Sequence, residues 1–130
     1  MIKFFSNFKI IFYLSNFFLI FLYLFPGSLL GLAINNDIRA QPQITPDFIV
    51  SSNHFYVFFI FSFIGFLSFV ETKQIKYLTI YLILLSLVLE FFHLFIPERS
   101  FQWTDLFGNL LGVIIVILIK TFINKYEKFK

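Results

Sequence analysis

The sequence predicts an all-α integral membrane protein, a bundle of four transmembrane helices with both termini on the cytoplasmic side. Three observations support this prediction: the chain is 59% hydrophobic and only 13% charged, its mean hydropathy is +0.89, and its apolar residues gather in long runs. This composition does not provide the solvated, charged surface of a soluble domain. Because a bilayer-crossing helix takes about 20 apolar residues, the chain has room for about four spans and no separate catalytic domain.

The four apolar segments cover residues 10–25, 51–70, 77–96 and 106–123. They lack the alternating pattern of barrel strands, and in hydrocarbon only a helix or a closed barrel satisfies every backbone hydrogen bond. We therefore expect one helix in each segment and a single domain over residues 1–130. The first segment also resembles a signal peptide, but a retained span keeps the number of spans even, as the distribution of charge requires.

The lysines mark one side of the predicted bundle. They lie near the two termini and in the link between the second and third segments, whereas Arg39 and Arg99 lie in the other two loops. Since Lys and Arg are enriched in short cytoplasmic loops, both termini are expected in the cytoplasm, and residues 26–50 and 97–104 are expected to face outward. The net charge of +3 is explained by this orientation and by contact with anionic lipids, so nucleic acid is not an expected partner.

The outer loop at residues 26–50 is rich in Pro, Asn, Asp and Gln. Loops of this length are either functional or disordered, so it is expected to form an ordered lid or a mobile cap. Its apolar stretch at residues 29–34 suits the membrane interface. The chain contains no Cys, which excludes disulfide and thiolate chemistry.

Polar residues interrupt the apolar pattern around residues 85–115. Glu90 and His93 are three apart and share one helix face, as do Asp105 and Asn109, which are four apart. Counted back from Pro97 at 1.5 Å per residue, Glu90 is expected about 10 Å below the outer end of its helix. Ionisable groups at such depth are costly and usually mark a buried polar site. The predicted ligand-binding residues are His54, Glu90, His93, Arg99, Asp105 and Asn109.

Two of these residues each admit two interpretations. His54 forms either a third wall of the pocket or an interfacial anchor at the start of the second segment. Arg99 either pairs with Glu98 at the surface or binds a different anion with its planar guanidinium group. That anion would be Glu90, Asp105, or a phosphate or carboxylate of a ligand.

Gly108 and Gly112 form a Gly-x-x-x-Gly pair in the fourth segment. Glycines at this spacing allow helix backbones to approach closely in lipid. We therefore expect the pair to serve helix packing rather than ligand contact.

The region that carries these residues resembles the signature of a known family. Leu89-Glu90-Phe91-Phe92-His93 through Pro97-Glu98-Arg99, then Trp103-Thr104-Asp105-Leu106 and Asn109-Leu110-Leu111-Gly112, is similar to the pattern of the VanZ-like family of small bacterial membrane proteins. That pattern runs Glu-x-x-Gln, a Pro near an Arg, then Asp-x-x-x-Asn-x-x-Gly. His93 stands where the family usually has Gln, and Val50-Ser51 stands where it commonly has Asp-Lys.

The resemblance implies a four-helix bundle in the bacterial cytoplasmic membrane with an outward polar pocket. The family is named for a protein associated with resistance to teicoplanin, which does not imply resistance for every member. The leading hypothesis is a non-catalytic cell-envelope protein whose pocket binds a lipid head group or a cell-wall or polysaccharide intermediate, with Arg99 contacting the anion. Membrane lipids are expected partners, no cofactor or metal is expected, and the oligomeric state stays open.

Three alternatives stand beside this hypothesis. In the first, the polar residues only satisfy one another and fix the helical hairpin. In the second, the protein is an intramembrane hydrolase or transferase in which His93 or His54 is the general base and Glu90 its partner, or in which both histidines and a carboxylate bind zinc. The third, transport, is disfavoured because four short helices without repeats make poor alternating-access machinery.

Overall fold

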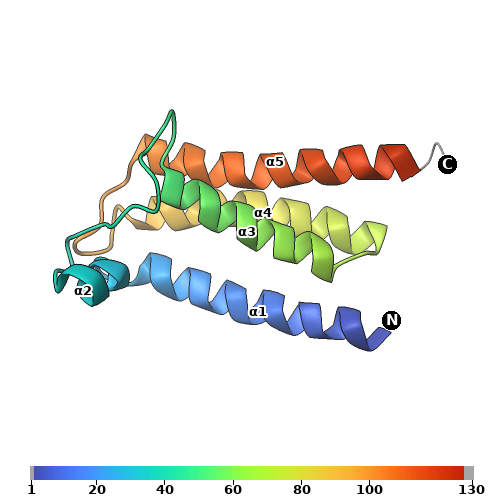
Figure 1. The fold of residues 1–130 in the computed structure, drawn as a ribbon, viewed down its shortest axis with the longest axis horizontal. Helices are drawn as coiled ribbons and strands as arrows, with labels where there is room; N and C mark the ends of the chain where they lie inside the picture. Colours follow the sequence, from blue (N-terminus) through green and yellow to red (C-terminus); the bar gives the residue numbers. More distant parts are fainter. Residues whose placement is uncertain (1, 128–130) are drawn as a thin grey trace.

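The computed structural model describes residues 2–127 and consists of five helices joined by loops, with no strand in that range (Figure 1). The all-α prediction is therefore confirmed. The helices are α1 (Ile2–Leu24), α2 (Leu29–Asn35), α3 (Ser52–Ser68), α4 (Thr72–Phe92) and α5 (Trp103–Glu127).

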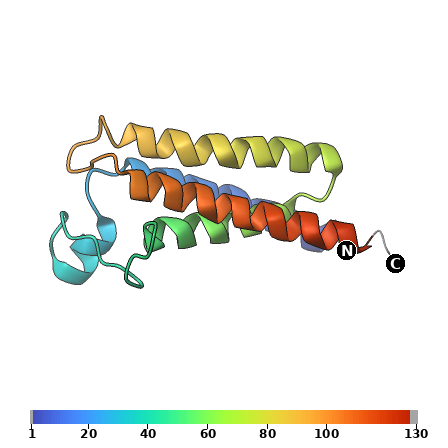
Figure 2. The same cartoon turned by 90° about the horizontal axis from the view of Figure 1, so that it is seen from above.

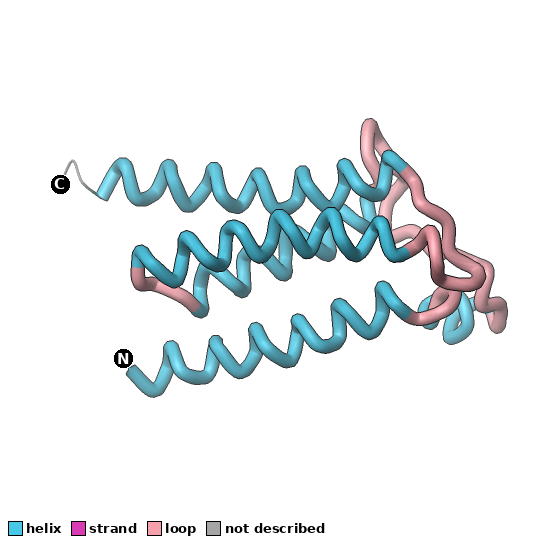
Figure 3. The backbone as a smooth tube through the Cα atoms, turned by 180° about the vertical axis from the view of Figure 1, so that it is seen from behind, coloured by secondary structure: helices cyan, strands magenta, loops and turns pink. Residues whose placement is uncertain are grey.

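The four longer helices lie along a common axis and alternate in direction (Figures 1 and 2). One end of the bundle, here called the loop end, carries α2 and the loops at residues 25–51 and 93–102. The opposite end, the turn end, carries the short α3–α4 connection, the first residue of α1 and the last of α5 (Figure 3). Because α3 contacts α1, α4 and α5, the helix ends at the loop end are held close together.

Several helices have the composition and length of membrane spans. Thr72–Phe92 and Trp103–Tyr126 are each long and apolar enough to cross a bilayer. Phe8–Leu24 and Leu29–Asn35 are long and apolar enough only when taken together, and they are bent by 77° at the break between them. Within the described residues, two helices could therefore cross a membrane, or three if the bent pair forms one span. At 17 residues, α3 is apolar but shorter.

The helix boundaries differ from the predicted segments. The third segment was expected to continue to Ile96, but α4 ends at Phe92 and residues 93–99 form turns. Pro97 contributes to the early end, since it cannot donate a hydrogen bond to the carbonyl group of His93, four residues earlier, and its ring would clash with that group in a helix. α1 and α4 begin before their apolar runs and α5 extends beyond its run at both ends, because polar residues also form helical backbone hydrogen bonds, whereas α3 lies within the run at residues 51–70.

The outer loop contains a helix that the hydropathy pattern did not reveal. The side chain of Ser28 accepts a hydrogen bond from the backbone N–H of Gly31 and caps the start of α2. Asn36 ends it with φ of 55°, a left-handed conformation that Asn tolerates. The apolar stretch expected at the membrane interface is thus a short capped helix at the loop end.

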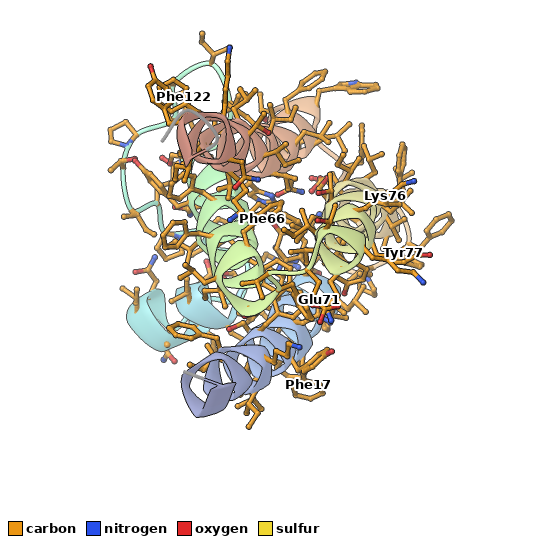
Figure 4. The ribbon with its side chains drawn as sticks, turned by 90° about the vertical axis from the view of Figure 1, so that its right-hand side faces the viewer. Phe17, Phe66, Glu71, Lys76, Tyr77 and Phe122 are labelled. Atoms are coloured by element: carbon orange, nitrogen blue, oxygen red, sulfur yellow. The ribbon has the colours of Figure 1, made fainter. Side chains whose placement is uncertain are left out.

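Large apolar side chains lie on the outside of the bundle as well as inside. Phe58, Leu82 and Val113 are fully buried. Seen from the turn end, Phe66 lies near the centre of the bundle, whereas residues such as Phe17 lie on its periphery (Figure 4). Apolar residues around the full circumference are typical of helices that contact lipid.

Two glycines of α5 allow it to lie directly against α3. A Cβ atom built on Gly108 would lie 2.7 Å from the carbonyl oxygen of Ser51, and one on Gly112 would lie 2.6 Å from that of Phe55. Both contacts are with backbone atoms, which cannot rotate away. The Gly-x-x-x-Gly pair thus lies in a helix–helix contact and holds the first turns of both helices together.

We expect Gly112→Ala to lower the free energy of unfolding by about 1–3 kcal/mol, because the added methyl group must push α5 away from the backbone of α3. Thermal unfolding of the detergent-solubilised protein measures this effect. Gly65→Ala is the matched control, since its Cβ would meet only side-chain atoms of Phe12 and Leu78 at 3.1–3.2 Å. Equal losses in the two variants would contradict the close backbone packing of α5 on α3.

Candidate functional site

The fold brings the six predicted site residues together at the loop end. His54 lies in the first turn of α3, and Glu90 in the last turn of α4. Asp105 and Asn109 lie in the first two turns of α5. Between α4 and α5, the connecting loop carries His93 and Arg99. The site is therefore built from helix ends that the alternating directions of the bundle place side by side.

Asn109 is the centre of a buried hydrogen-bond network. Its Oδ1 accepts a 2.7 Å hydrogen bond from the hydroxyl of Tyr23 and lies 3.1 Å from Nδ1 of His54. Its Nδ2 donates to the carbonyl oxygen of Ser86 at 3.3 Å. Tyr23 comes from α1, His54 from α3 and Ser86 from α4, so this one amide joins all four long helices.

His93 and Glu90 form a second buried pair. Nε2 of His93 lies 3.1 Å from the carbonyl oxygen of Tyr23, and because a carbonyl only accepts, Nε2 is the donor. Nδ1 of His93 lies 3.3 Å from Oε1 of Glu90, which also accepts a hydrogen bond from the backbone N–H of Gln102 at 3.2 Å. Because the proton of a neutral His93 lies on Nε2, Nδ1 and Oε1 are both hydrogen-bond acceptors. Their contact is attractive only when one further proton is bound, either to Nδ1 of His93 or to the Glu90 carboxylate.

The expected depth of Glu90 was wrong, although the residue is fully buried. Glu90 lies two residues before the end of α4, rather than about two turns inside it. It is inaccessible because the loop after α4 folds back over it and donates the N–H of Gln102. Burial of this carboxylate thus comes from the loop rather than from its position along the helix.

Glu90 and Asp105 flank His54 on two sides. Oε2 of Glu90 lies 3.7 Å from Nδ1 of His54, and Oδ2 of Asp105 lies 3.5 Å from Nε2. Oε2 of Glu90 has no hydrogen-bond partner among the described residues. Such an unsatisfied buried oxygen is rare in folded proteins and calls for a proton, a water or an ion.

Arg99 does not make either of the protein contacts that the sequence suggested. Its Nε and Nη2 donate to the carbonyl oxygens of Phe25 and Leu22, at 3.3 and 3.0 Å, which end α1. Glu98 instead pairs with Arg39 of the outer loop, at 2.9 Å. Helix-terminal carbonyls lack partners within the helix and carry partial negative charge, so they compete well for the guanidinium.

A cavity of about 260 Å³ opens beside this network. Its wall includes His54, His93, Arg99 and Asp105, whereas Glu90 and Asn109 are fully buried behind it. Apolar residues from α1, α2 and α3 form another part of the wall: Leu19, Leu22, Leu29, Leu30 and Val57. The cavity therefore offers polar and apolar surfaces to the same occupant.

Partial burial lowers the pKa of Arg99 below its ordinary value, while the nearby Glu90, Asp105 and Tyr23 act in the opposite direction. The guanidinium still carries its positive charge at neutral pH, because arginine is the most basic of the side chains. The cavity wall thus contains one permanent cation.

The outer loop is tied down over the start of α3. The backbone N–H of Ser52 donates to Oδ1 of Asp47 at 2.9 Å, and its hydroxyl donates to the carbonyl oxygen of Thr45 at 2.7 Å. The side chain of Asn53 donates to the carbonyl oxygen of Pro42 at 2.8 Å. Of the two forms expected for this loop, these contacts describe an ordered lid.

Sequence reasoning missed Tyr23, which is 8% exposed and contacts Asn109, His54 and His93. Tyrosines near span ends usually anchor a helix at the interface, and nothing local distinguishes Tyr23 from the others. The one available signal is its position on the helix, since the spacing of Phe12, Leu19 and Tyr23 places all three on the buried face of α1. Gln102 was also missed because it acts through its backbone.

Comparison of the chain with models of known families, with curated proteins and with solved structures finds no match.

We expect Tyr23→Phe to lower the free energy of unfolding by about 1–3 kcal/mol, because it leaves the buried Oδ1 of Asn109 without its closest donor. Thermal unfolding in detergent measures the loss. Tyr13→Phe is the control on the same helix, since Tyr13 is 60% exposed. If both variants unfold at the same temperature, the hydroxyl of Tyr23 does not stabilise the fold.

Proposed function

We propose that the chain is a four-span membrane protein of the VanZ-like type whose pocket binds the anionic head group of a membrane amphiphile. The amphiphile would be an anionic lipid or a lipid-linked cell-wall or polysaccharide intermediate. One observation carries the proposal: Arg99 is fixed in the wall of a cavity that is polar on one side and apolar on another.

The position of Arg99 supports recognition of an anion. Its Nε and Nη2 are held by the end of α1, while Nη1 makes no hydrogen bond to any described residue. A guanidinium fixed in this way loses little side-chain entropy when it binds a phosphate or carboxylate. The remaining donor and the full charge are thus preorganised for a ligand.

The remaining wall of the cavity supports an amphiphilic ligand. Leu19 and Leu22 of α1 and Val57 of α3 belong to the apolar bundle, whereas Gln41 and Gln43 belong to the polar outer loop. A head group beside the polar wall and a chain along the leucines would satisfy both surfaces. A small hydrophilic metabolite would leave the apolar wall hydrated.

The buried state of His93 disfavours a role for this histidine as the general base of a hydrolase. Its Nε2 contacts the carbonyl oxygen of Tyr23 and its Nδ1 faces Glu90, and the residue is 2% exposed. A general base must reach the substrate proton directly or through one water. A base with both nitrogens engaged is poorly suited to that role.

The distribution of lysines supports the topology in which both termini are cytoplasmic. Lys73 and Lys76 belong to the first turns of α4 at the turn end, and Lys125 to the last turn of α5. Lys128 and Lys130, which also belong to the predicted pattern, lie outside the described residues. With α3 as the fourth span, the positive-inside rule would place the pocket on the outer face of a bacterial cytoplasmic membrane.

We expect Arg99→Gln to weaken binding of phosphatidylglycerol at least about tenfold, because it removes a charged hydrogen-bond donor. Native mass spectrometry of lipid adducts on the detergent-solubilised protein measures the change. Arg39→Gln is the matched control, because Arg39 is the other arginine and lies outside the cavity wall. Equal binding by the two variants, at equal thermal stability, would refute the assignment of Arg99.

We expect Ser100→Cys to react with a membrane-impermeant maleimide in intact cells, and Glu71→Cys to react only after permeabilisation, because the proposed topology places them on opposite sides. Both positions are exposed, and the chain has no other cysteine. Mass-tag labelling on gels reads out the reaction. Labelling of both cysteines from the same side would refute the topology.

A further inference from the structure

We propose that His54, Asp105 and Glu90 bind a divalent transition-metal ion of the zinc type at the base of the pocket. The inference rests on the proposed function in one respect: the open coordination position would take an oxygen of the anionic head group. The geometry of the three side chains supports the metal site independently of that head group.

Two hydrogen bonds fix the tautomer of His54. The hydroxyl of Tyr23 donates to Oδ1 of Asn109 at 2.7 Å, so the atoms that face Nδ1 of His54 are oxygens that accept from it, each at 3.1 Å. The proton of a neutral imidazole therefore lies on Nδ1, and Nε2 presents a lone pair. Metal-binding histidines are fixed in the same way, by a hydrogen bond from their second nitrogen.

Asp105 places a carboxylate oxygen beside the unprotonated nitrogen of His54. Its Oδ2 lies 3.5 Å from Nε2 of His54, and both atoms are acceptors in this tautomer. Two acceptors at this distance need a cation or a proton between them. Ligands of a tetrahedral zinc ion lie about 3.3 Å apart, given bonds of about 2.0–2.1 Å, so the observed separation is close to that of a metal-bound pair.

Glu90 is fully buried, and its Oε2 has no hydrogen-bond partner among the described residues. This oxygen lies 3.7 Å from Nδ1 of His54, the nitrogen that carries the proton in this tautomer, so the carboxylate has to rotate toward Nε2 to reach a metal held by His54 and Asp105. A buried carboxylate oxygen without a partner, close to an imidazole and a second carboxylate, is an additional indication of a missing cation.

The three residues together provide a coordination set. One atom from each of His54, Glu90 and Asp105 lies within 4.8 Å of the other two, so inward shifts of about 1 Å would reach tetrahedral spacing. One imidazole and two carboxylates suit zinc or manganese better than calcium or magnesium. Because His54 and Asp105 line the cavity with Arg99, the fourth position would open toward the proposed anion site.

The structure favours this set over one that includes both histidines. Nε2 of His93 donates to the carbonyl oxygen of Tyr23, and its Nδ1 lies beside Oε1 of Glu90 rather than Oε2. His93 is thus placed to orient Glu90. The set also differs from the sequence-based alternative of two histidines and one carboxylate.

Zinc titration of the full-length protein in detergent tests the proposal, after removal of any affinity tag and treatment with EDTA. Competition with a chromophoric chelator should show one Zn²⁺ per chain. Asp105→Asn, which preserves the shape of the side chain, and His54→Gln should each weaken binding at least about 100-fold, since loss of a ligand should exceed the 10–100-fold cost of losing an orienting group. Glu98→Gln, an exposed carboxylate outside the cavity wall, should leave binding unchanged.

Two results would overturn the metal site: no stoichiometric zinc in folded wild type, or equal affinity in wild type and Asp105→Asn. If His54→Gln does not fold, X-ray absorption at the zinc edge of the wild type decides its role. One imidazole among oxygen ligands is expected, and two imidazoles would overturn the proposed set in favour of one that includes His93.

The failure of this inference can be distinguished from the failure of the proposed function. Zinc binding without any preference for phosphatidylglycerol over phosphatidylcholine adducts would leave the metal site and refute the head-group pocket. Phosphatidylglycerol binding that is lost in Arg99→Gln, in a protein that takes up no zinc, would leave the pocket and refute the metal. Phosphatidylglycerol binding that weakens when EDTA removes the zinc would support both.

Discussion

The arrangement of the loop end depends on the hydrogen bonds that the buried side-chain amide of Asn109 requires. Asn109 is fully buried in an apolar bundle, where each unsatisfied polar atom costs about 1–3 kcal/mol. Its oxygen and nitrogen find partners on α1, α3 and α4. Apolar packing alone would allow the four helices to slide or rotate past one another, because contacts between hydrocarbon groups are not directional. The hydrogen bonds of Asn109 select one register, and the register places His54 between two carboxylates.

Close packing makes this selection feasible. Gly108 and Gly112 flank Asn109 on α5 and allow its backbone to touch that of α3. A larger residue at either position would hold the helices apart and move Asn109 out of reach of His54. The small residues and the amide therefore act together: the glycines set the distance between the helices, and the amide sets their rotation.

Sequence reasoning found what depends on spacing along one helix and missed what depends on neighbours far apart in the chain. The spacings of Glu90 with His93 and of Asp105 with Asn109 identified the polar faces, and hydropathy identified the four long helices but not α2. The partners of Arg99 could not be found in this way, because they are backbone carbonyls of α1, which every residue type supplies. Tyr23 was missed because its role depends on Asn109, 86 positions away. The end of α4 was predicted too late in the chain, because the residues that form the turn before Pro97 are also apolar and hydropathy does not distinguish them from the helix.

The bonds from Arg99 to the last carbonyls of α1 give the pocket a mechanical connection to the rest of the fold. The chain bends by 77° between α1 and α2, immediately after those carbonyls. The guanidinium thereby fastens the α4–α5 loop to this elbow through Nε and Nη2, while Nη1 makes no hydrogen bond to a described residue. An anion bound at Arg99 would contact the loop and the elbow at the same time. Occupancy of a small polar site would thereby brace the bend between two apolar helices.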